Sequence, residues 1–204
     1  MTEQFDLFQP PEEKAVEKAP KEPRVLYFDL ETQKSADEVG GWGNIHLMKL
    51  AVGVVWDSLD KQHHVYLEHE AKALVDKLRS AALVVGFNVI GFDYTVLQPE
   101  ASIDLQDLKT FDMLVDIKKK LGFRLSLDHL AGHTLNAKKS ADGLVSLQWY
   151  KDGKIDKIVE YCKQDVNVTR DLFLFGQENG FVRYQSRSGK TMELPVDWKI
   201  EQLI

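Results

Sequence analysis

The sequence has one cysteine, Cys162, so it forms no internal disulfide, which fits a reducing compartment such as the cytoplasm. Cys162 lies within a helical pattern, and we expect it to pack in the core rather than to act in catalysis. No apolar run is long enough to span a membrane. The first residues lack a basic region followed by an apolar one, so we expect no secretory signal there. These absences predict a cytoplasmic protein.

Basic residues are also fewer than acidic ones. The sequence has 26 Lys and Arg and 32 Asp and Glu, which gives a formal net charge of −6. This charge argues against non-specific binding of duplex nucleic acid through a broad basic surface. It does not exclude an enzyme of nucleic acids, because a divalent cation in an acidic pocket can receive a phosphate group. The 204 residues, of which 44% are hydrophobic, suffice for one ordinary domain and an appendage.

The first 23 residues differ in composition from the remainder. From Gln9 to Pro23 they are mainly Pro, Glu, Lys and Ala, which cannot bury much apolar surface. We therefore expect a disordered tail over residues 1–23 and one folded domain over residues 24–204. The tail carries a short apolar peptide, Gln4-Phe5-Asp6-Leu7-Phe8. This peptide either docks on the surface of the domain or acts as a linear binding motif on a flexible tether.

The stretch from Val25 to Thr32 predicts a buried central strand that ends in two carboxylates. Its β-branched, aliphatic and aromatic residues are typical of a strand covered on both faces. Side chains alternate along a strand, so Asp29 and Glu31 point the same way. Two carboxylates on one face repel each other unless a cation or a proton lies between them. Oxygen ligands of this kind suit magnesium or manganese.

The remaining pattern alternates strands with helices. Apolar runs predict strands at 50–56, 63–67 and 83–88, and helical spacing predicts helices at 70–82, 126–135 and 155–178. Residues 109–121 are typical of a strand leading into a helix, 138–143 of a loop, and 181–196 of a β-hairpin. This order predicts an α/β fold with a mixed sheet flanked by helices. The glycine-rich stretch 40–44 predicts a loop, in which Trp42 either packs or stacks on a base.

Two later segments add carboxylates to the predicted site. The strand at 83–88 ends in Asn88, and Asp93 follows after a glycine turn, where sites gather in α/β sheets. The structural alternative for Asp93 is an N-cap of the next helix. On the last long helix, Tyr161 and Asp165 are four residues apart and project from one face. Asp112 either contacts and positions residues of the site, or it caps a helix.

Together these segments resemble the DEDD superfamily of 3′–5′ exonucleases, which have a ribonuclease H-like fold. The three matching motifs are Phe28-Asp29-Leu30-Glu31-Thr32, Asn88-Val89-Ile90-Gly91-Phe92-Asp93 and Tyr161-Cys162-Lys163-Gln164-Asp165. One branch of the superfamily has histidine five residues before the last aspartate. Here that residue is Glu160, so the chain resembles the tyrosine branch, over about residues 24–180.

The resemblance implies a metal-dependent enzyme that hydrolyses phosphodiester bonds with two divalent ions, Mg²⁺ or Mn²⁺. It implies that Asp29, Glu31 and Asp165 hold one ion, and that Asp29 and Asp93 hold the other. Tyr161 would then orient the attacking water. The resemblance further implies a grip on the terminal nucleotide by Leu30, Thr32, Asn88 and Phe92.

The tail peptide resembles the pentapeptide with which bacterial proteins bind the replication sliding clamp. That pattern is Gln, a variable or aliphatic residue, Ser or Asp, Leu and Phe, and here Phe5 stands where Leu is usual. The resemblance implies a sliding clamp as partner, and it favours single-stranded DNA ends in bacterial replication or repair as the substrate. An exonuclease that trims the 3′ end of RNA is the alternative enzyme. A catalytically silent module recruited to the clamp is the alternative from another class.

Overall fold

A computed structural model gives the structure of the chain, and it describes residues 22–137 and 143–204. The predicted disordered tail and the peptide at residues 4–8 fall on residues 1–21, outside the described residues. The loop predicted at 138–143 does so as well, except for Gly143. No helix in the part of the chain that the structure describes is long and apolar enough to cross a membrane.

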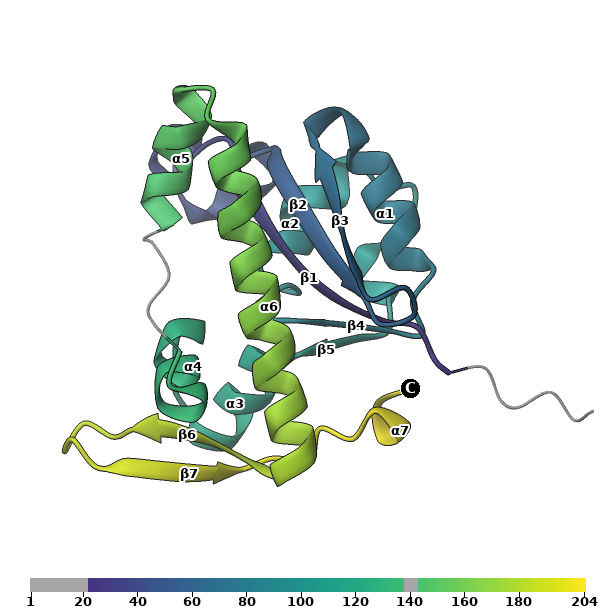
Figure 1. Cartoon of the computed structure of the whole chain (residues 1–204). Helices are drawn as coiled ribbons and strands as arrows, with labels where there is room; N and C mark the ends of the chain where they lie inside the picture. The colour runs from purple at the N-terminus through teal and green to yellow at the C-terminus, as the bar shows by residue number, and fades with distance from the viewer. Residues whose placement is uncertain (1–21, 138–142) are drawn as a thin grey trace, which may run out of the picture.

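The central strand of the sheet is the one that carries the first two carboxylates. Within the described residues, five strands form a mixed sheet in the order β3-β2-β1-β4-β5 (Figure 1). β1 is antiparallel to β2 and parallel to β4, and the pairs β2–β3 and β4–β5 are antiparallel and parallel, respectively. The strand bounds are Val25–Thr32 (β1), Leu50–Asp57 (β2), Gln62–Leu67 (β3), Leu83–Gly86 (β4) and Thr110–Asp112 (β5). The predicted α/β fold is confirmed.

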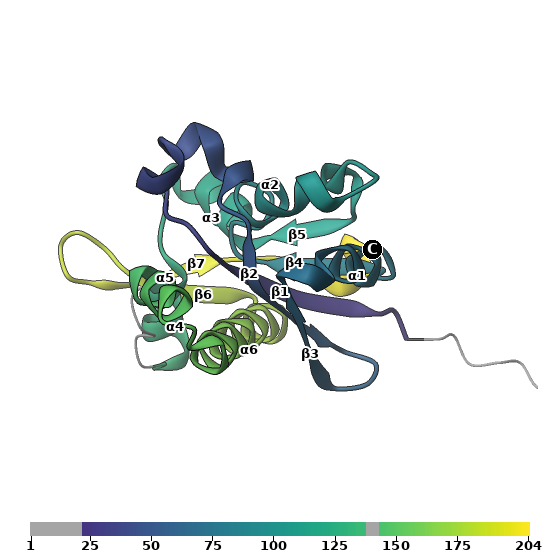
Figure 2. The ribbon, with the colours of Figure 1, turned by 90° about the horizontal axis from the view of Figure 1, so that it is seen from above.

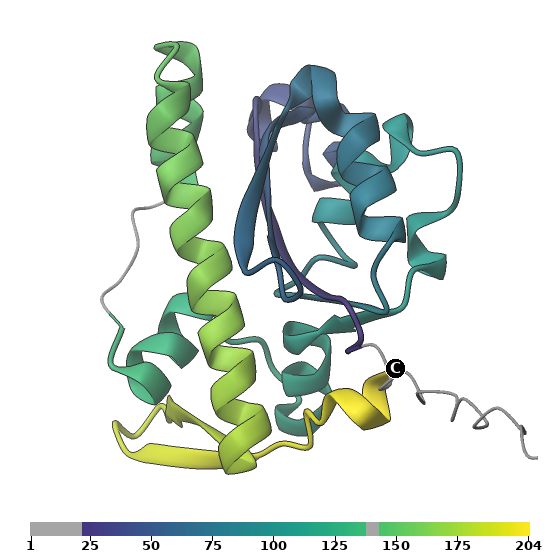
Figure 3. The ribbon, with the colours of Figure 1, turned by 45° about the vertical axis from the view of Figure 1, so that its right-hand side comes forward.

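Alternation along β1 divides the core into two halves. Leu26 and Phe28 pack against α1 (Ala71–Arg79) and α2 (Asp93–Leu97), whereas Val25 and Tyr27 pack against the long helix α6 (Ile155–Asn179). Figure 3 shows the sheet nearly edge-on, with α6 on one side and α1 on the other. Asp29 and Glu31 belong to the same alternating set as Tyr27, so they face α6.

Short helices complete the layer beside α6. α3 (Met113–Leu121) follows β5, and α4 (Leu127–Leu135) packs against α6, as Figure 2 shows from above. The Ser126 hydroxyl accepts a hydrogen bond from the His129 N–H, as expected of an N-cap. α6 ends at Gly180, whose φ of 74° is the left-handed conformation typical of a helix C-cap. The predicted helices at 70–82, 126–135 and 155–178 are therefore present within a few residues of their expected ends.

The C-terminal segment returns to the lower end of α6. β6 (Phe181–Gln185) and β7 (Thr191–Pro195) form the predicted hairpin, and α7 (Ile200–Leu203) follows. Trp198 lies before α7 and is fully buried. Its ring stacks on Phe173 at 5.9 Å, and its indole N–H donates to Asp116 Oδ2 at 2.9 Å. A Cβ at Gly176 of α6 would lie 2.3 Å from the Trp198 ring, so only glycine lets the ring sit this close to the helix.

Two local predictions were wrong or incomplete. Helix α5 (Gly143–Lys151) begins where a loop was predicted, and we assigned no helix to the residues after it. Its apolar residues are not confined to one side, because Leu144 and Val145 face solvent while Ser146 is buried. The helix therefore lacks the one-sided stripe on which helix prediction depends. The glycine-rich stretch 40–44 also leads into helical structure, because two 3₁₀ turns that meet at a kink at Asn44 span Trp42–Leu47.

Candidate active site

Three carboxylates from two elements meet beside the central strand. Asp29 and Glu31 project from β1, and Asp165 projects from α6, which packs against that strand (Figure 1). One ligand oxygen from each lies within 4.8 Å of the other two. The two-residue period of β1 and the packing of α6 on it therefore bring together the acids of the first and third motifs, as predicted for Asp29, Glu31 and Asp165. Glu31 and Asp165 are 134 positions apart in the sequence.

Asp93 joins this group through the backbone of β1. It is the first residue of α2 and is buried, and its Oδ1 accepts a hydrogen bond from the Leu30 N–H at 3.1 Å. The alternative that Asp93 is the N-cap is wrong, because Phe92 occupies that position. The Asp93 side chain is thus held toward the strand that carries Asp29 and Glu31, and all four predicted acids lie in one region.

Burial makes the carboxyl groups of Asp29, Glu31 and Asp93 hard to ionise. It raises the pKa of Glu31 to about 7 against the hydrogen bond from Ser146, with Asp165 adding to the rise. Burial likewise raises the pKa of Asp93 to about 8. The pKa of Asp29 lies well above its ordinary value because Asp29 is buried next to Asp93, Asp165 and Glu31. A buried group of mutually repelling carboxylates is stabilised by a cation, and its oxygen ligands fit a hard divalent metal ion. The residues present therefore fit the metal-dependent chemistry implied by the sequence.

Two neighbours that contact these acids come from the helical layer. The Ser146 hydroxyl on α5 donates to Glu31 Oε2 at 2.5 Å. The thiol of Cys162 on α6 is buried, and its Sγ lies 3.4 Å from Asp29 O and 3.5 Å from Asp29 Oδ2. Cys162 packs in the core as predicted, in contact with Asp29. Burial, together with the adjacent acids, raises the pKa of the thiol, so it remains protonated and unreactive.

A cavity of about 580 Å³ opens beside the acids. Asp29, Glu31 and Asp93 line it, as do all four residues predicted to grip a nucleotide: Leu30, Thr32, Asn88 and Phe92. Trp42 lies at its rim with 70% of its surface exposed, and its ring is tilted at 6.5 Å from that of Phe92. The volume lies in the range of small-ligand sites, and aromatic rings beside carboxylates suit a base next to a phosphate.

Asp112 fixes the loop that carries Asn88. Its Oδ1 accepts the Asn88 N–H at 2.8 Å, and its Oδ2 accepts the Ile90 N–H at 3.1 Å. The same carboxylate caps α3 by accepting the Leu114 N–H. Asn88 has a φ of 69°, so the loop holds it in a left-handed conformation. Asp112 therefore fulfils both roles that the sequence left open.

Tyr161 lies one helical turn before Asp165 but borders a different cavity. Its ring meets the edge of Trp149 from α5 at a centroid distance of 6.2 Å, and Lys157 lies over the same indole at 5.9 Å. Both rings line a cavity of about 800 Å³ along α6. Neither Tyr161 nor Asp165 lines the cavity of about 580 Å³ around the four residues predicted to bind a nucleotide. The role of the Tyr161 hydroxyl therefore stays a prediction.

Comparison with known proteins gives the family. A model of the 3′–5′ exonuclease family matches residues 9–175, which include all three motifs. The chain belongs to this 3′–5′ exonuclease family. The resemblance to the DEDD superfamily is thereby confirmed, and the acid group can hold the metal on which such enzymes depend. Assignment of this exonuclease to the tyrosine branch rests on the Tyr161 motif alone.

A solved structure agrees with the fold. The exonuclease is similar to part of a family B DNA polymerase from the archaeon Pyrobaculum calidifontis, with a TM-score of 0.56 at 20% identity. The match covers 78% of the exonuclease and 25% of the polymerase, so the chain spans about a quarter of the length of that protein. No curated protein matched the sequence.

Sequence reasoning missed three side chains that contact the predicted site residues. Ser146 and Trp149 lie on α5, which we did not predict, so their contacts with Glu31 and Tyr161 had no visible basis. Trp42 was predicted either to pack or to stack on a base, and its place at the cavity rim beside Phe92 leaves its exposed ring free for stacking. Arg124 was also missed, although its Nη2 donates to Asn88 Oδ1 at 3.1 Å.

Proposed function

We propose that this 3′–5′ exonuclease hydrolyses phosphodiester bonds at the 3′ ends of single-stranded DNA and releases nucleoside 5′-monophosphates. The observation that carries the proposal is the meeting of Asp29, Glu31 and Asp165 beside a cavity of about 580 Å³ lined by aromatic and apolar side chains. The acids suit a phosphodiester and the cavity suits one nucleotide. A cavity of this kind holds an unpaired end better than a duplex, because the terminal base must leave its stack to enter it.

In this proposal the four acids divide the metal binding among them. Asp29, Glu31 and Asp165 would hold one ion, and Asp29 and Asp93 a second, both Mg²⁺ or Mn²⁺. When bound, such ions activate water and stabilise the charge that develops on the phosphate oxygens. Ser146 keeps Glu31 oriented and favours its ionised form through the hydrogen bond to Oε2. The Leu30 N–H likewise orients Asp93 and favours its ionised form through the hydrogen bond to Oδ1.

Tyr161 would orient the attacking water through its hydroxyl group. An unperturbed tyrosine has a pKa near 10, so it is a poor general base at neutral pH, and orientation is the better role. The Trp149 ring holds Tyr161 from the side by its edge contact. Leu30, Thr32, Asn88 and Phe92 would bind the terminal nucleotide in the cavity that they line. These roles make Tyr161 a water-positioning residue and the other four substrate-binding residues.

The deciding experiment incubates the purified chain with 5′-labelled single-stranded DNA in Mg²⁺, in Mn²⁺ and in EDTA. We expect a ladder that shortens from the 3′ end, and we expect EDTA and Asp29→Ala to abolish it. Tyr161→Phe should retain metal binding but cleave roughly a hundredfold or more slowly. Asp76→Asn serves as the matched control, because this aspartate is exposed on α1 and its ion-pair partner among the described residues is Arg79.

Each alternative has its own result in the same assay. An RNA strand of identical sequence that is cut faster than the DNA would make RNA trimming the function. An intact strand in every lane, for both DNA and RNA, would favour the silent binding module. The complete set of four acids argues against silence, because a pure binding module has no need of buried, mutually repelling carboxylates. Full activity of Tyr161→Phe would show that the water-positioning role is wrong.

We further propose that Gln4, Phe5, Asp6, Leu7 and Phe8 bind a bacterial sliding clamp, which would place the enzyme in replication or repair in the cytoplasm. The proposal rests on the sequence of this peptide alone, since it lies outside the described residues. A synthetic peptide of residues 1–12 should bind purified clamp, and the same peptide with Leu7→Ala and Phe8→Ala should not. Absence of binding by the unsubstituted peptide would contradict the proposal.

A further inference from the structure

The β6–β7 hairpin lies outside the part of the chain that matches the exonuclease family. The family model ends at residue 175, whereas the hairpin spans Phe181–Pro195. In two views at right angles the hairpin extends past α4 and away from the sheet (Figures 1 and 2). It is thus an addition to the matched domain, and the mechanism proposed above makes no use of it.

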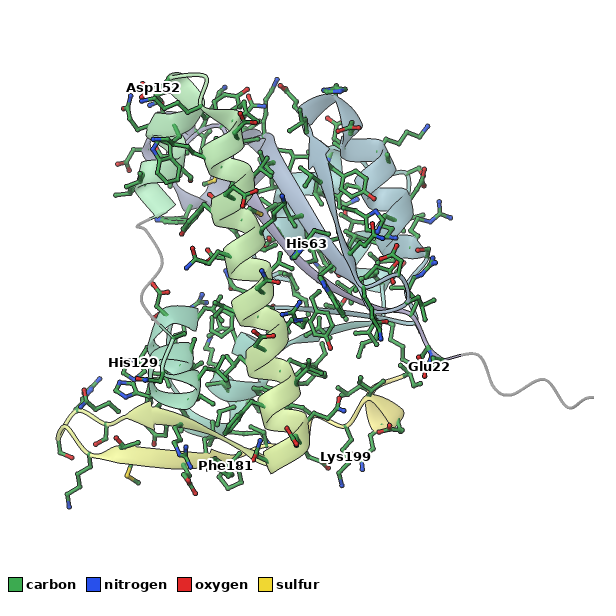
Figure 4. All side chains as sticks on the ribbon, in the orientation of Figure 1. Glu22, His63, His129, Asp152, Phe181 and Lys199 are labelled. Atoms are coloured by element: carbon green, nitrogen blue, oxygen red, sulfur yellow. The ribbon has the colours of Figure 1, made fainter. Side chains whose placement is uncertain are left out.

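Side chains of α4 hold the hairpin at its outer edge. The Thr134 hydroxyl accepts the Arg183 N–H at 2.8 Å and donates to the Arg183 carbonyl at 3.1 Å. His129 Nε2 accepts the Gln185 N–H at 3.0 Å, and Figure 4 shows His129 on α4 next to the hairpin. These bonds satisfy edge groups that would otherwise be open to another strand. The hairpin is therefore fixed in position relative to the domain.

A series of contacts leads to this hairpin from the cavity of about 580 Å³ beside the acids, which we call the nucleotide cavity. Asn88 lines the cavity, and its Oδ1 accepts the hydrogen bond from Arg124 in the α3–α4 turn. Next to Arg124 in the chain is Phe123, which is 45% exposed and meets the ring of Tyr184 on β6 at 6.4 Å. One cationic group at the rim of the cavity is thus followed by two aromatic rings that lead to β6.

Two exposed basic residues extend the series at the hairpin tip. Arg187 and Lys190 flank the turn beyond Gln185, and neither has an ion pair with any residue that the structure describes. By contrast, Arg183 on the same hairpin is neutralised by Glu193 at 3.0 Å. In a chain with net charge −6, uncompensated cations beside exposed aromatic rings form a local surface that complements a polyanion.

We infer that Arg124, Phe123, Tyr184, Arg187 and Lys190 form a track for the nucleotides on the 5′ side of the one being removed. The basic side chains contact backbone phosphates, and the two rings stack on bases. Basic side chains combined with aromatic rings are how proteins bind single strands without regard to sequence. The track rests on the proposed function, because that function places the terminal nucleotide in the cavity where the track begins. Tyr184, Arg187 and Lys190, which form the hairpin part of the track, lie beyond residues 9–175 that match the family model.

Binding measured in EDTA tests the track apart from catalysis. A labelled single strand of about 12 nucleotides, long enough to cover such a track, is titrated with the intact chain in a filter-binding assay. Arg187→Gln combined with Lys190→Gln should weaken binding roughly three- to tenfold and reduce the slope of log affinity against log salt by about 0.7 per charge removed. Phe123→Ala should weaken binding with little change in that slope. Lys61→Gln combined with Lys72→Gln, at exposed sites near α1, is the matched control.

Activity on two substrates then separates the track from the proposed function. The double hairpin variant should raise KM for the long strand while leaving kcat unchanged. It should cleave a nitrophenyl ester of thymidine 5′-monophosphate, which fills only the cavity, as fast as the unsubstituted enzyme does. Equal loss on both substrates, or unchanged binding of the long strand in EDTA, would overturn the track. If the unsubstituted enzyme cleaves neither substrate, the proposed function fails, and the binding result alone decides the inference.

Discussion

Ser146 is the residue on which the ionisation of Glu31 depends most directly. Burial raises the pKa of Glu31, and the hydrogen bond from the Ser146 hydroxyl opposes that rise. The bond is short, at 2.5 Å, and it engages one of the two carboxylate oxygens, Oε2. A group that must be ionised to bind a metal is therefore kept closer to its ionised form by a hydroxyl from another helix.

Replacing this hydroxyl should shift the activity of the enzyme toward alkaline pH. In Ser146→Ala, the pKa of Glu31 rises further, so the carboxylate becomes available for a metal only at higher pH. We expect the rising limb of the pH–rate profile to move up and the rate at neutral pH to fall about tenfold. The measurement is the cleavage rate in Mg²⁺ across pH 6–9. An unmoved rising limb would show that Ser146 has no influence on Glu31.

Sequence reasoning at this scale found the acids but not their supports. Asp29, Glu31, Asp93 and Asp165 each lie in a local pattern, at a strand end or on a helix face, that can be read without knowing the fold. Ser146 has no such pattern, because its contact with Glu31 joins residues 115 positions apart. Which serine reaches a given carboxylate depends on how a helix packs, and periodicity carries no information about that.

At the scale of elements, the C-terminal segment depends on a close approach to α6. The buried ring of Trp198 lies against Gly176, stacks on Phe173 and donates a hydrogen bond to Asp116 on α3. One side chain therefore ties α3, the lower half of α6 and the segment after the hairpin together. The fit requires that α6 present no side chain at position 176.

A methyl group at this position should destabilise the fold. In Gly176→Ala the new Cβ would lie 2.3 Å from the Trp198 ring, so the ring or the helix must move. We expect a loss of about 1–3 kcal/mol in the free energy of unfolding, seen as a melting temperature lower by about 2–4 °C per kcal/mol.

Gly132→Ala is the matched control, since it also lies within a helix and its Cβ would meet nothing closer than the Ala137 carbonyl at 3.8 Å. That change should be neutral or stabilise the helix by about 0.5–1 kcal/mol, because alanine is the better helix former. Equal melting temperatures for the two variants would refute the close-packing account.

The long elements were predictable and one short element was not. α6 has a clear apolar stripe, including Ile158, Cys162 and Val166, and glycine at its C-terminus. α5 also has a glycine after its C-terminus, Gly153 with a φ of 70°, but it lacks the apolar stripe because it lies between solvent and the acids instead of on the sheet. Helix prediction needs a one-sided apolar stripe, and a helix that presents a polar residue to an active site does not have one.

At the scale of the whole molecule, two sets of buried carboxylates change the stability of the fold with pH in opposite directions. Burial alone would raise the pKa of Asp57, but the hydrogen bond from Lys77, the Leu59 N–H and the charges of Lys77 and Arg24 outweigh it, so the pKa is lowered. Asp57 therefore stabilises the fold above its unfolded pKa near 4, and this contribution is lost as the pH falls below that value. Asp29, Glu31 and Asp93 have raised pKa values, and their effect on stability has the reverse sign.

We expect the metal-free enzyme to be most stable in mildly acidic solution. Glu31 and Asp93 have pKa values of about 7 and 8 in the folded state, so the folded form binds more protons than the unfolded form from about pH 4 upward. Stability in EDTA should therefore fall as the pH rises from about 5 to 8. Melting temperatures measured in EDTA and in Mg²⁺ over this range check the sign, and Mg²⁺ should reduce the alkaline loss.

Asp29→Asn gives the corresponding test by mutation. The change removes one of the repelling charges while keeping the shape of the side chain. The variant should melt higher than the unsubstituted protein in EDTA at pH 8, and it should gain less from Mg²⁺. A lower melting temperature at this pH would show that the acid group does not strain the metal-free fold.

The position of Trp42 gives the enzyme an optical reporter of its own. Of the four tryptophans, Trp198 is sealed in the core, whereas Trp42 is 70% exposed at the rim of the nucleotide cavity. A base that settles against its indole should quench the part of the fluorescence that dissolved acrylamide can reach. Titration with thymidine 5′-monophosphate would then follow occupancy of the cavity by emission alone. Trp42→Phe should be silent in that titration, and an undiminished signal from it would place the reporter elsewhere.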